Sequence, residues 1–419
     1  MDDQISITVV VVSNGRPALL RRCLLGINQL FFQNFEVVVV ADSAAIAAIG
    51  DLPFSPQLKM KVFDEENISR ARNLAVGLAG GDVVAFIDDD AVPEPTWLTQ
   101  ISSPFSDPDV CAVAGYVLGR NGISLQWGAE TIGPDTSSKR LPIDGLESVL
   151  PKLPKHCALK LQGTNFAVCR SILVELGGFD EAFEFYLDDT DFAFRLGLVG
   201  KKAAVAPGAI VHHGFAESGR RFQNRVPKSL FQIGASQAVY LRKHLPDRMQ
   251  RRHLSRFMSN QRRRLGRLLV DGHLEPADVR RLMADLKAGF DAGKLRRAGQ
   301  AASFPDEIPQ FAPLRGSAPE ASIFLSGRWF QQDDLQQSGS KIAANGQPVT
   351  LLILSPTMRA QTARFTVDGI WLQSGGLFGH TKRTEPRFQF WLFGRRVRAE
   401  QRRLEQFRGP FATNLPAFR

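Results

Sequence analysis

Acidic side chains gather at two places in this sequence where they could bind a cation or move a proton. The first is "VVAFIDDDAVPEP" (83–95), in which an apolar, β-branched run leads directly into Asp88, Asp89 and Asp90. Like charges at the end of a buried strand repel one another unless a cation neutralises them, and Mg²⁺ and Mn²⁺ prefer such oxygen ligands. A solvated acidic turn would have the same residues, so this motif alone leaves both interpretations open.

The second acidic group is Asp188, Asp189 and Asp191 in "FYLDDTDFAFRL" (185–196). The pattern predicts a helix that begins near Asp188. Carboxylates at a helix N-terminus often have a purely structural role as caps. An ionised carboxylate that faces a cleft can also act as a general base. Both roles remain open on these residues alone.

Two histidines follow a third apolar run, in "AIVHHG" (209–214). A neutral imidazole is a common metal ligand, although a single histidine more often has a structural role. His212 and His213 therefore join the candidates for a metal site.

The elements around these residues predict a mainly parallel sheet with helices on both faces. Apolar strand-like runs alternate with helix-like runs over the first hundred residues, as expected for such a sheet. The predicted strands are 5–12, 35–42, 58–63 and 82–87, and the predicted helices begin at Pro17 and at 68. Ligands bind at the carboxyl ends of such strands. Ser13, Asp42 and the three aspartates all lie at such ends.

Over about residues 5 to 222 the chain resembles the family-2 glycosyltransferases of the GT-A fold. The resemblance rests on motifs in the family's order: "VVSNGRP", "VVADSA", "ARN" (71–73), "FIDDD" followed by "VPEPTWL", "GGFDE" with the later "DDTDFAFR", and the late-strand histidine. Two departures from the family's pattern stand out. Asp188 replaces the usual glutamate, and the first turn lacks the family's tyrosine.

The resemblance implies a set of roles. The nucleobase of the nucleotide-sugar donor would contact Asp42, with Ser13 nearby. The remaining donor-binding residues would be Arg72, Asp88, Asp89, Gly163, Thr164 and Asn165. Mn²⁺ or Mg²⁺ would be held by Asp90 and His212, with His213 as the reserve ligand. Asp189, or Asp188 in its place, would be the catalytic base of an inverting displacement.

The chain has 419 residues, a formal charge of +10 and four cysteines without CxxC spacing. Ten Lys and Arg against one acid lie between Arg242 and Arg267, so the basicity is local. A helical apolar stripe with surrounding arginines over 242–269 could lie on an anionic membrane, but core packing is the commoner use of such a stripe. No recognition module accompanies the charge, so nucleic acid is not an expected partner.

The expected organisation is a GT-A domain over 1–225, a basic helical segment over 226–302, a Pro/Gly-rich linker over 303–320 and a β-rich region over 321–419. The chain is expected to begin with a strand and not a signal peptide. The scattered cysteines predict a cytoplasmic protein, with a peripheral position at the inner face of the membrane as an option.

The expected function is transfer of a sugar from a UDP-, GDP- or dTDP-linked donor to a glycan or lipid-linked acceptor in cell-surface polysaccharide synthesis. A nucleotidyltransferase is an alternative, but "SNGRP" is a poor match for its Gly-rich, Lys-bearing loop. A catalytically inactive scaffold that binds glycans or a membrane is another, and the complete set of acidic residues argues against it.

Overall fold

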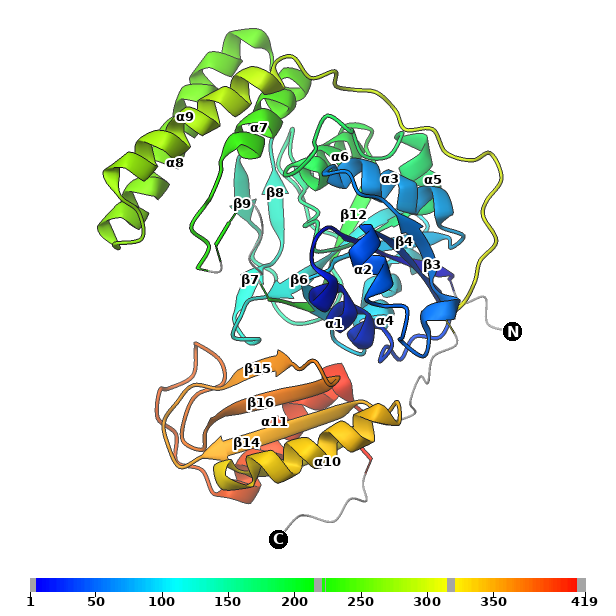
Figure 1. Ribbon diagram of the computed structural model, residues 1–419, viewed down its shortest axis with the longest axis vertical. Helices are drawn as coiled ribbons and strands as arrows, with labels where there is room; N and C mark the ends of the chain where they lie inside the picture. Colours follow the sequence, from blue (N-terminus) through cyan, green and yellow to red (C-terminus); the bar gives the residue numbers. More distant parts are fainter. Residues whose placement is uncertain (1–4, 215–220, 223, 315–320, 413–419) are drawn as a thin grey trace.

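A nine-stranded sheet forms the centre of the computed structural model, which describes residues 5–214, 221–222, 224–314 and 321–412 (Figure 1). The strands follow the order β3-β2-β1-β4-β11-β6-β12-β5, with β7 added beside β6. The pairings among β1 to β4 and between β6 and β12 are parallel, whereas β11, β5 and β7 are antiparallel to their neighbours. The strands of this sheet are β1 (Ile7–Ser13), β2 (Phe35–Ala41), β3 (Lys59–Val62), β4 (Val83–Asp88), β5 (Ala91–Pro93), β6 (Val110–Leu118), β7 (Leu125–Trp127), β11 (Asn165–Cys169) and β12 (Lys202–His213).

Helices cover both faces of the sheet, as the continuous apolar strands predict. One buried cluster joins Val9 and Val11 to α1 and α4, and the other joins Val10 to α3, α5 and α6. Successive strand residues point to opposite faces, so each strand supplies both cores. The helices are α1 (Pro17–Ile27), α2 (Ser43–Ala47), α3 (Ile68–Leu78), α4 (Trp97–Ser102), α5 (Arg170–Glu175) and α6 (Asp188–Leu198), with 3₁₀ turns at Ser55–Gln57 and Ser103–Ser106. The expected α/β fold is confirmed.

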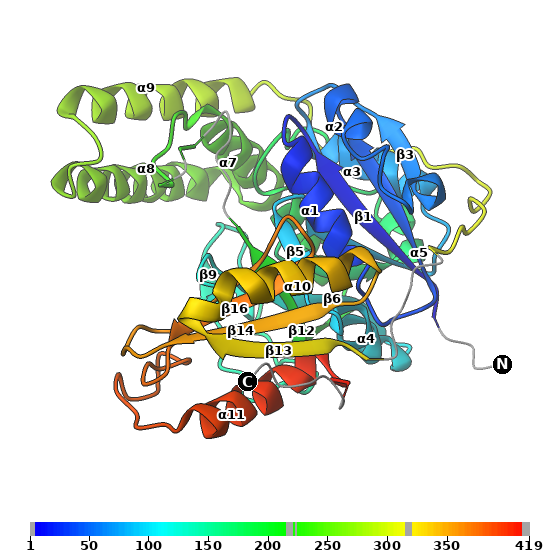
Figure 2. The ribbon, with the colours of Figure 1, turned by 60° about the horizontal axis from the view of Figure 1, so that its bottom comes forward.

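A small sheet and three helices extend from one side of this domain. The sheet contains β8 (Glu130–Ile132), β9 (Ser138–Arg140) and β10 (Ala158–Leu159), and the helices are α7 (Phe231–His244), α8 (Asp247–Val270) and α9 (Pro276–Gly293). Helix α7 anchors the group, because the Tyr240 hydroxyl donates to the Gly133 carbonyl at 3.0 Å and the ring packs against Phe194. Helices α8 and α9 project away from the domain (Figure 2).

The apolar stripe of α8 packs inward. Leu265 is fully buried among residues of α9 and the segment before α7, and Phe257, Met258 and Leu268 contact the same cluster. The packing interpretation of the stripe is therefore confirmed. Most of the arginines of α8 remain exposed, and Arg256 pairs with Asp135 of the β8–β9 turn.

The chain after α9 returns along the edge of the first domain (Figure 1). Leu314 lies in the core below the sheet and its amide donates to Phe35, while Lys59 donates to the carbonyl of Gln310 at 2.6 Å. The described part of the predicted linker is thus bound to the sheet edge; residues 315–320 lie outside the described residues.

The C-terminal region is a four-stranded sheet between two helices. Its strands, in the order β13-β14-β16-β15, are β13 (Ile323–Arg328), β14 (Val349–Ser355), β15 (Thr362–Phe365) and β16 (Ile370–Gly376), and a 3₁₀ turn at Trp329–Gln331 leads into the first helix. Helix α10 (Gln332–Ala344) packs on one face and α11 (Phe393–Arg408) on the other. Strands were expected over 321–419, but the two helices were not, because most of their residues are polar.

Candidate functional site

The carboxyl ends of β1 and β4 bring Ser13 next to Asp89. The two strands pair in parallel with Val12 opposite Asp88, and the Ser13 hydroxyl donates to Asp89 at 2.5 Å. Arg16, in the turn after β1, lies 2.7 Å from the other oxygen of Asp89. Burial raises the pKa of Asp89 to about 7 despite the opposing charge of Arg16. Asp89 is fully buried and lies below the site, where it orients its neighbours.

Asp88, Asp90 and His213 form the cluster that could hold a cation. One ligand atom from each of the three lies within 4.8 Å of the others, and His213 Nε2 lies 3.0 Å from Asp90 Oδ1. The other ring nitrogen, Nδ1, lies 3.3 Å from Oε1 of Gln126 on β7. In the tautomer that donates from Nδ1 to this oxygen, Nε2 can present its lone pair to a metal.

His212 is therefore not the histidine at this cluster, and its prediction as the metal ligand is wrong in position. Neighbouring residues on a strand point to opposite faces. His212 Nε2 instead lies 2.6 Å from Glu94, on the side of the C-terminal region. The reserve candidate, His213, lies beside Asp88 and Asp90.

Two arginines border the acidic cluster. Arg16 and Arg221 each lie 3.6 Å from Asp90 Oδ2, and both side chains remain partly exposed. Guanidinium groups in this position can neutralise the carboxylates or bind phosphate oxygens. Neither residue is among the predicted site residues, although Arg16 belongs to the "SNGRP" turn at the end of the first strand. Nothing in the sequence pattern points to Arg221 or Gln126.

Arg72 joins the two acidic groups. Its guanidinium pairs with Asp188, lies 3.5 Å from Asp88 and donates to the carbonyl of Gly163 at 3.0 Å. The side chain is 2% exposed. Burial raises the pKa of Asp188 to about 6, with the Arg72 charge opposing that rise. Arg72 thus holds the Asp188 end of α6 beside the acidic end of β4.

Asp189 is the more accessible carboxylate of the second group. Its Oδ2 accepts from the Gly163 amide at 2.6 Å, and its Oδ1 accepts from the amide and hydroxyl of Thr190. A Cβ on Gly163 would lie 2.9 Å from Asp189 Oδ2, so glycine permits this approach. Tyr186 and Leu187, at φ 75° and 69°, form a strained turn that positions the start of α6.

Asp191 is unavailable as a base. It is fully buried and binds Arg195 at 2.8 Å, His244 at 2.7 Å and Lys243 at 2.8 Å. Burial alone would raise its pKa, but these partners lower it well below the ordinary range.

The "GTN" residues have separate roles. The Thr164 hydroxyl donates to Asp88 at 2.6 Å, so this residue does border the cluster. Asn165, in contrast, is fully buried, accepts from the Trp97 indole and donates to the carbonyls of Tyr116 and Ala209. Its polar atoms face the protein interior, so its predicted contact with the donor is wrong.

Asp42 lies at the end of β2. It caps α2 by accepting from the Ala45 amide at 3.0 Å and accepts from the Gly15 amide at 2.6 Å. It thereby connects the turns after β1 and β2.

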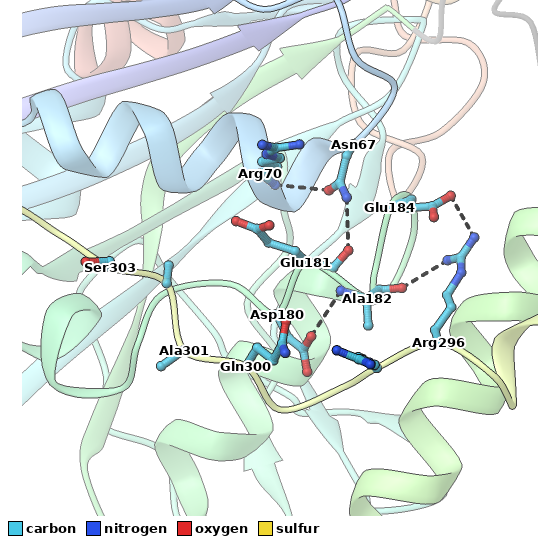
Figure 3. A pocket seen from close by; sticks show the side chains of 12 residues that line it. Asn67, Arg70, Asp180, Glu181, Ala182, Glu184, Arg296, Gln300, Ala301 and Ser303 are labelled. Atoms are coloured by element: carbon cyan, nitrogen blue, oxygen red, sulfur yellow. Dashed lines mark hydrogen bonds and ion pairs between the residues drawn. The ribbon is translucent and has the colours of Figure 1, made fainter.

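A polar cavity of about 410 Å³ lies apart from these residues, between the start of α3 and the segment after α9 (Figure 3). Arg296 crosses it to Glu184 at 2.6 Å and to the Ala182 carbonyl at 2.9 Å. Asn67 donates to the Glu181 carbonyl. None of the predicted site residues lines it, and its paired charges hold the returning chain in place.

The first half of the chain is similar to known glycosyltransferases. Residues 8–172 match the model of Glycosyl transferase family 2. The pre-mycofactocin glycosyltransferase of Mycobacterium tuberculosis is 28% identical over 211 residues, 49% of this chain and 42% of that protein. The O-antigen biosynthesis protein RfbC of Myxococcus xanthus is 25% identical over 235 residues, 53% of this chain and 18% of that protein.

The chain therefore spans less than half the length of these curated relatives. Among solved structures, the mannosyltransferase PcManGT from Pyrobaculum calidifontis, in complex with GDP-Man and Mn²⁺, aligns with a TM-score of 0.42 and 16% identity over 70% of this chain and 88% of that one. The family match covers the segment that carries Ser13, Asp42, Arg72 and the three consecutive aspartates. Over residues 8–172, the chain is therefore similar to glycosyl transferase family 2.

Proposed function

We propose that this protein is a metal-dependent, inverting glycosyltransferase that moves a sugar from a nucleotide-diphosphate donor to a glycan or lipid-linked acceptor in cell-surface polysaccharide synthesis. The observation that carries the proposal is the convergence of Asp88, Asp90 and His213, linked to Asp189 through Arg72 and Gly163.

The residues of the acidic cluster fit a divalent cation. The cluster offers two carboxylates and one imidazole, of which Asp90 and His213 are buried and Asp88 is partly exposed. Mn²⁺ accepts such ligands and Mg²⁺ tolerates them. When bound, the cation would neutralise the charge that develops on the departing nucleotide diphosphate. Arg16 and Arg221 could then contact phosphate oxygens as well as Asp90.

The catalytic base would come from α6. Asp189 would take the proton of the acceptor hydroxyl as that oxygen attacks the anomeric carbon, and a single displacement inverts the configuration there. Gly163 and Thr190 fix the orientation of its carboxylate.

The donor would be bound at the ends of the first strands. Asp42 would contact the nucleobase of the donor, and Ser13 and Asp89 would support Arg16 and Asp90 from below.

A donor screen tests this function. Thermal shift and hydrolysis would be measured with UDP-, GDP- and dTDP-sugars, each with Mn²⁺, with Mg²⁺ and with chelator. One nucleotide should stabilise the protein only when a cation is present, and a His213→Ala variant should lose that stabilisation. No stabilisation by any nucleotide, or equal stabilisation under chelator, would reject the proposal.

Peripheral contact with a membrane is the second part of the proposal, because a lipid-linked acceptor requires it. The apolar stripe of α8 is used in packing, so this helix can offer only charge, through exposed arginines such as Arg252 and Arg263. Among the described residues, no helix combines the length and apolar character needed to cross a bilayer.

Sedimentation with vesicles tests this contact. The protein should bind phosphatidylglycerol vesicles at low salt and phosphatidylcholine vesicles not at all. Replacing Arg251, Arg252, Arg262 and Arg263 by Gln should remove that binding, and binding that survives the replacement would exclude α8 as the contact.

A further inference from the structure

The face of β12 opposite the acidic cluster carries a second buried cluster of charged and polar groups. His212 Nε2 lies 2.6 Å from Glu94 Oε1. Arg408, at the end of α11 in the C-terminal region, donates to both oxygens of the same carboxylate, at 2.7 Å each. Glu94, His212 and Arg408 are 3%, 8% and 1% exposed, so the three groups pair with one another away from solvent.

Trp371 of β16 closes this cluster from the C-terminal side. The Arg408 guanidinium lies 4.1 Å from the centre of the indole, and the His212 ring lies 4.8 Å from it. Phe365 and Trp371 also pack against Val92 of β5. The C-terminal region thus covers the back of the strand pair β5–β12 (Figure 2).

That strand pair carries the candidate metal ligands on its other side. Asp90 immediately precedes β5, His213 ends β12, and His213 is paired with Ala91. The Gly214 amide donates to the Asp90 carbonyl at 2.9 Å, which continues the ladder. The Glu94–His212 hydrogen bond joins the residue that follows β5 to β12, so we expect a shift of either residue to change the separation of Asp90 from His213.

Arg408 supplies the positive charge that makes this arrangement stable. Burial by itself would raise the pKa of Glu94, but the charges and hydrogen bonds of Arg408 and His212 outweigh it and lower that pKa to about 2. An unpaired carboxylate is costly to bury. Without Arg408, the ionised Glu94 carboxylate would have a lower free energy in water than in its buried position. It would therefore move toward water, and β5 would move with it.

We infer that Arg408 is a positioning residue of the metal site, and that the C-terminal region is needed to keep Asp90 and His213 at ligand distance. The inference rests on the proposed function, since it assumes that these residues bind a divalent cation. Further contacts fix the region in this place: the Gln29 amide donates to the Gly369 carbonyl at 2.7 Å, and the Ala363 amide to the Asn121 carbonyl at 2.8 Å.

The test compares two buried arginines of the same helix in the full-length protein. Arg396 is 2% exposed, but its partners are Gly379, Thr381 and Glu400, all within the C-terminal region. Mn²⁺ affinity would be measured by electron paramagnetic resonance, without substrate, in the wild type, Arg408→Gln and Arg396→Gln, with the melting temperature of each. Arg408→Gln should bind Mn²⁺ about 10-fold more weakly, Arg408→Lys should recover part of the loss, and Arg396→Gln should match the wild type even though its melting temperature falls.

Should Arg408→Gln not fold, the paired variant Glu94→Gln with Arg408→Gln leaves no unpaired charge but also lacks the two hydrogen bonds that hold residue 94 in place, so it should show part of the loss of Mn²⁺ affinity. Wild-type affinity in a folded variant without Arg408 would overturn the inference while leaving the proposed function intact. Equal losses in Arg396→Gln and Arg408→Gln would also overturn it, since general destabilisation would then explain both. No Mn²⁺ binding by the wild type would overturn the inference and the metal-dependent function together.

Discussion

At the scale of single residues, the fold gives three neighbouring carboxylates three different roles. Asp188 pairs with the buried Arg72, and Asp191 is enclosed by three basic partners. Asp189 alone of the three is outside the buried set, with its orientation fixed by Gly163 and Thr190. A base must reach the acceptor hydroxyl, so we propose Asp189, and neither of its neighbours, as the base.

Replacing this carboxylate should separate binding from chemistry. Asp189→Asn keeps the shape of the side chain but cannot take a proton, so kcat should fall by about 10²–10⁴-fold. Mn²⁺ and donor affinities, measured by titration calorimetry, should stay near those of the wild type. Turnover at the wild-type rate would move the base role to Asp188.

Gly163 should be sensitive to the smallest possible enlargement. A Cβ there would meet Asp189 Oδ2 at 2.9 Å and Arg72 Nη2 at 3.0 Å, both ends of functional side chains. Gly163→Ala should therefore lower kcat/KM while the protein remains folded. Gly266→Ala in α8 is the matched control, because its Cβ would meet nothing within 4 Å, and it should leave kcat/KM unchanged. Equal activity of both variants would contradict the close approach at residue 163.

At the scale of elements, α8 shows how one helix divides its surface. Its apolar residues contribute to the core of the helical segment, and its arginines give that segment a concentrated positive charge. The same pattern of residues would suit a helix lying in a membrane. Packing against α9 decides between the two, since the apolar face is already covered.

Leu265 and Arg252 should respond very differently to replacement. Leu265→Ala leaves a cavity in a fully buried position and should lower the free energy of unfolding by about 2–4 kcal/mol. Arg252→Gln alters an exposed side chain and should change it by less than about 0.5 kcal/mol. Denaturant unfolding monitored by circular dichroism measures both, and a small effect at Leu265 would mean that the helix is not packed as described.

At the scale of the whole molecule, the C-terminal region and the first α/β domain share a buried ion pair. Glu94 and Arg408 are 314 residues apart in the chain, yet each is the main charged partner of the other. Breaking such a pair costs more than the pair itself contributes, because the remaining charge stays buried. The two parts should therefore unfold cooperatively.

This ion pair predicts a pH dependence of stability. The pKa of Glu94 is about 2 in the folded protein, below its ordinary value of 4.5, so the unfolded chain takes up this proton more readily. The contribution is fully present above about pH 4.5 and is lost as the pH falls from there through about 2. Thermal melts should show that Glu94→Gln is less stable than the wild type at neutral pH and that the difference shrinks over this window. A constant difference would contradict the shifted pKa.

Much of the site could be predicted because its motifs are local. An apolar run followed by three aspartates places carboxylates at a strand end, and "DDTD" before an apolar helical pattern places them at a helix start. The order of these motifs along the chain was enough to indicate the family and a parallel sheet. That fold also implied that β4 and β11 lie together and that α6 lies near them.

What the sequence alone determined was which residue types stand at the ends of the strands and helices, and hence the class of chemistry. Only the tertiary structure decided which way they face. Both histidines of "VHH" satisfy the same local pattern, but the pairing of β12 with β5 turns His213 toward Asp90 and His212 toward Glu94. The side-chain direction depends on pairing between segments more than a hundred residues apart, and the charge that stabilises it comes from the far end of the chain.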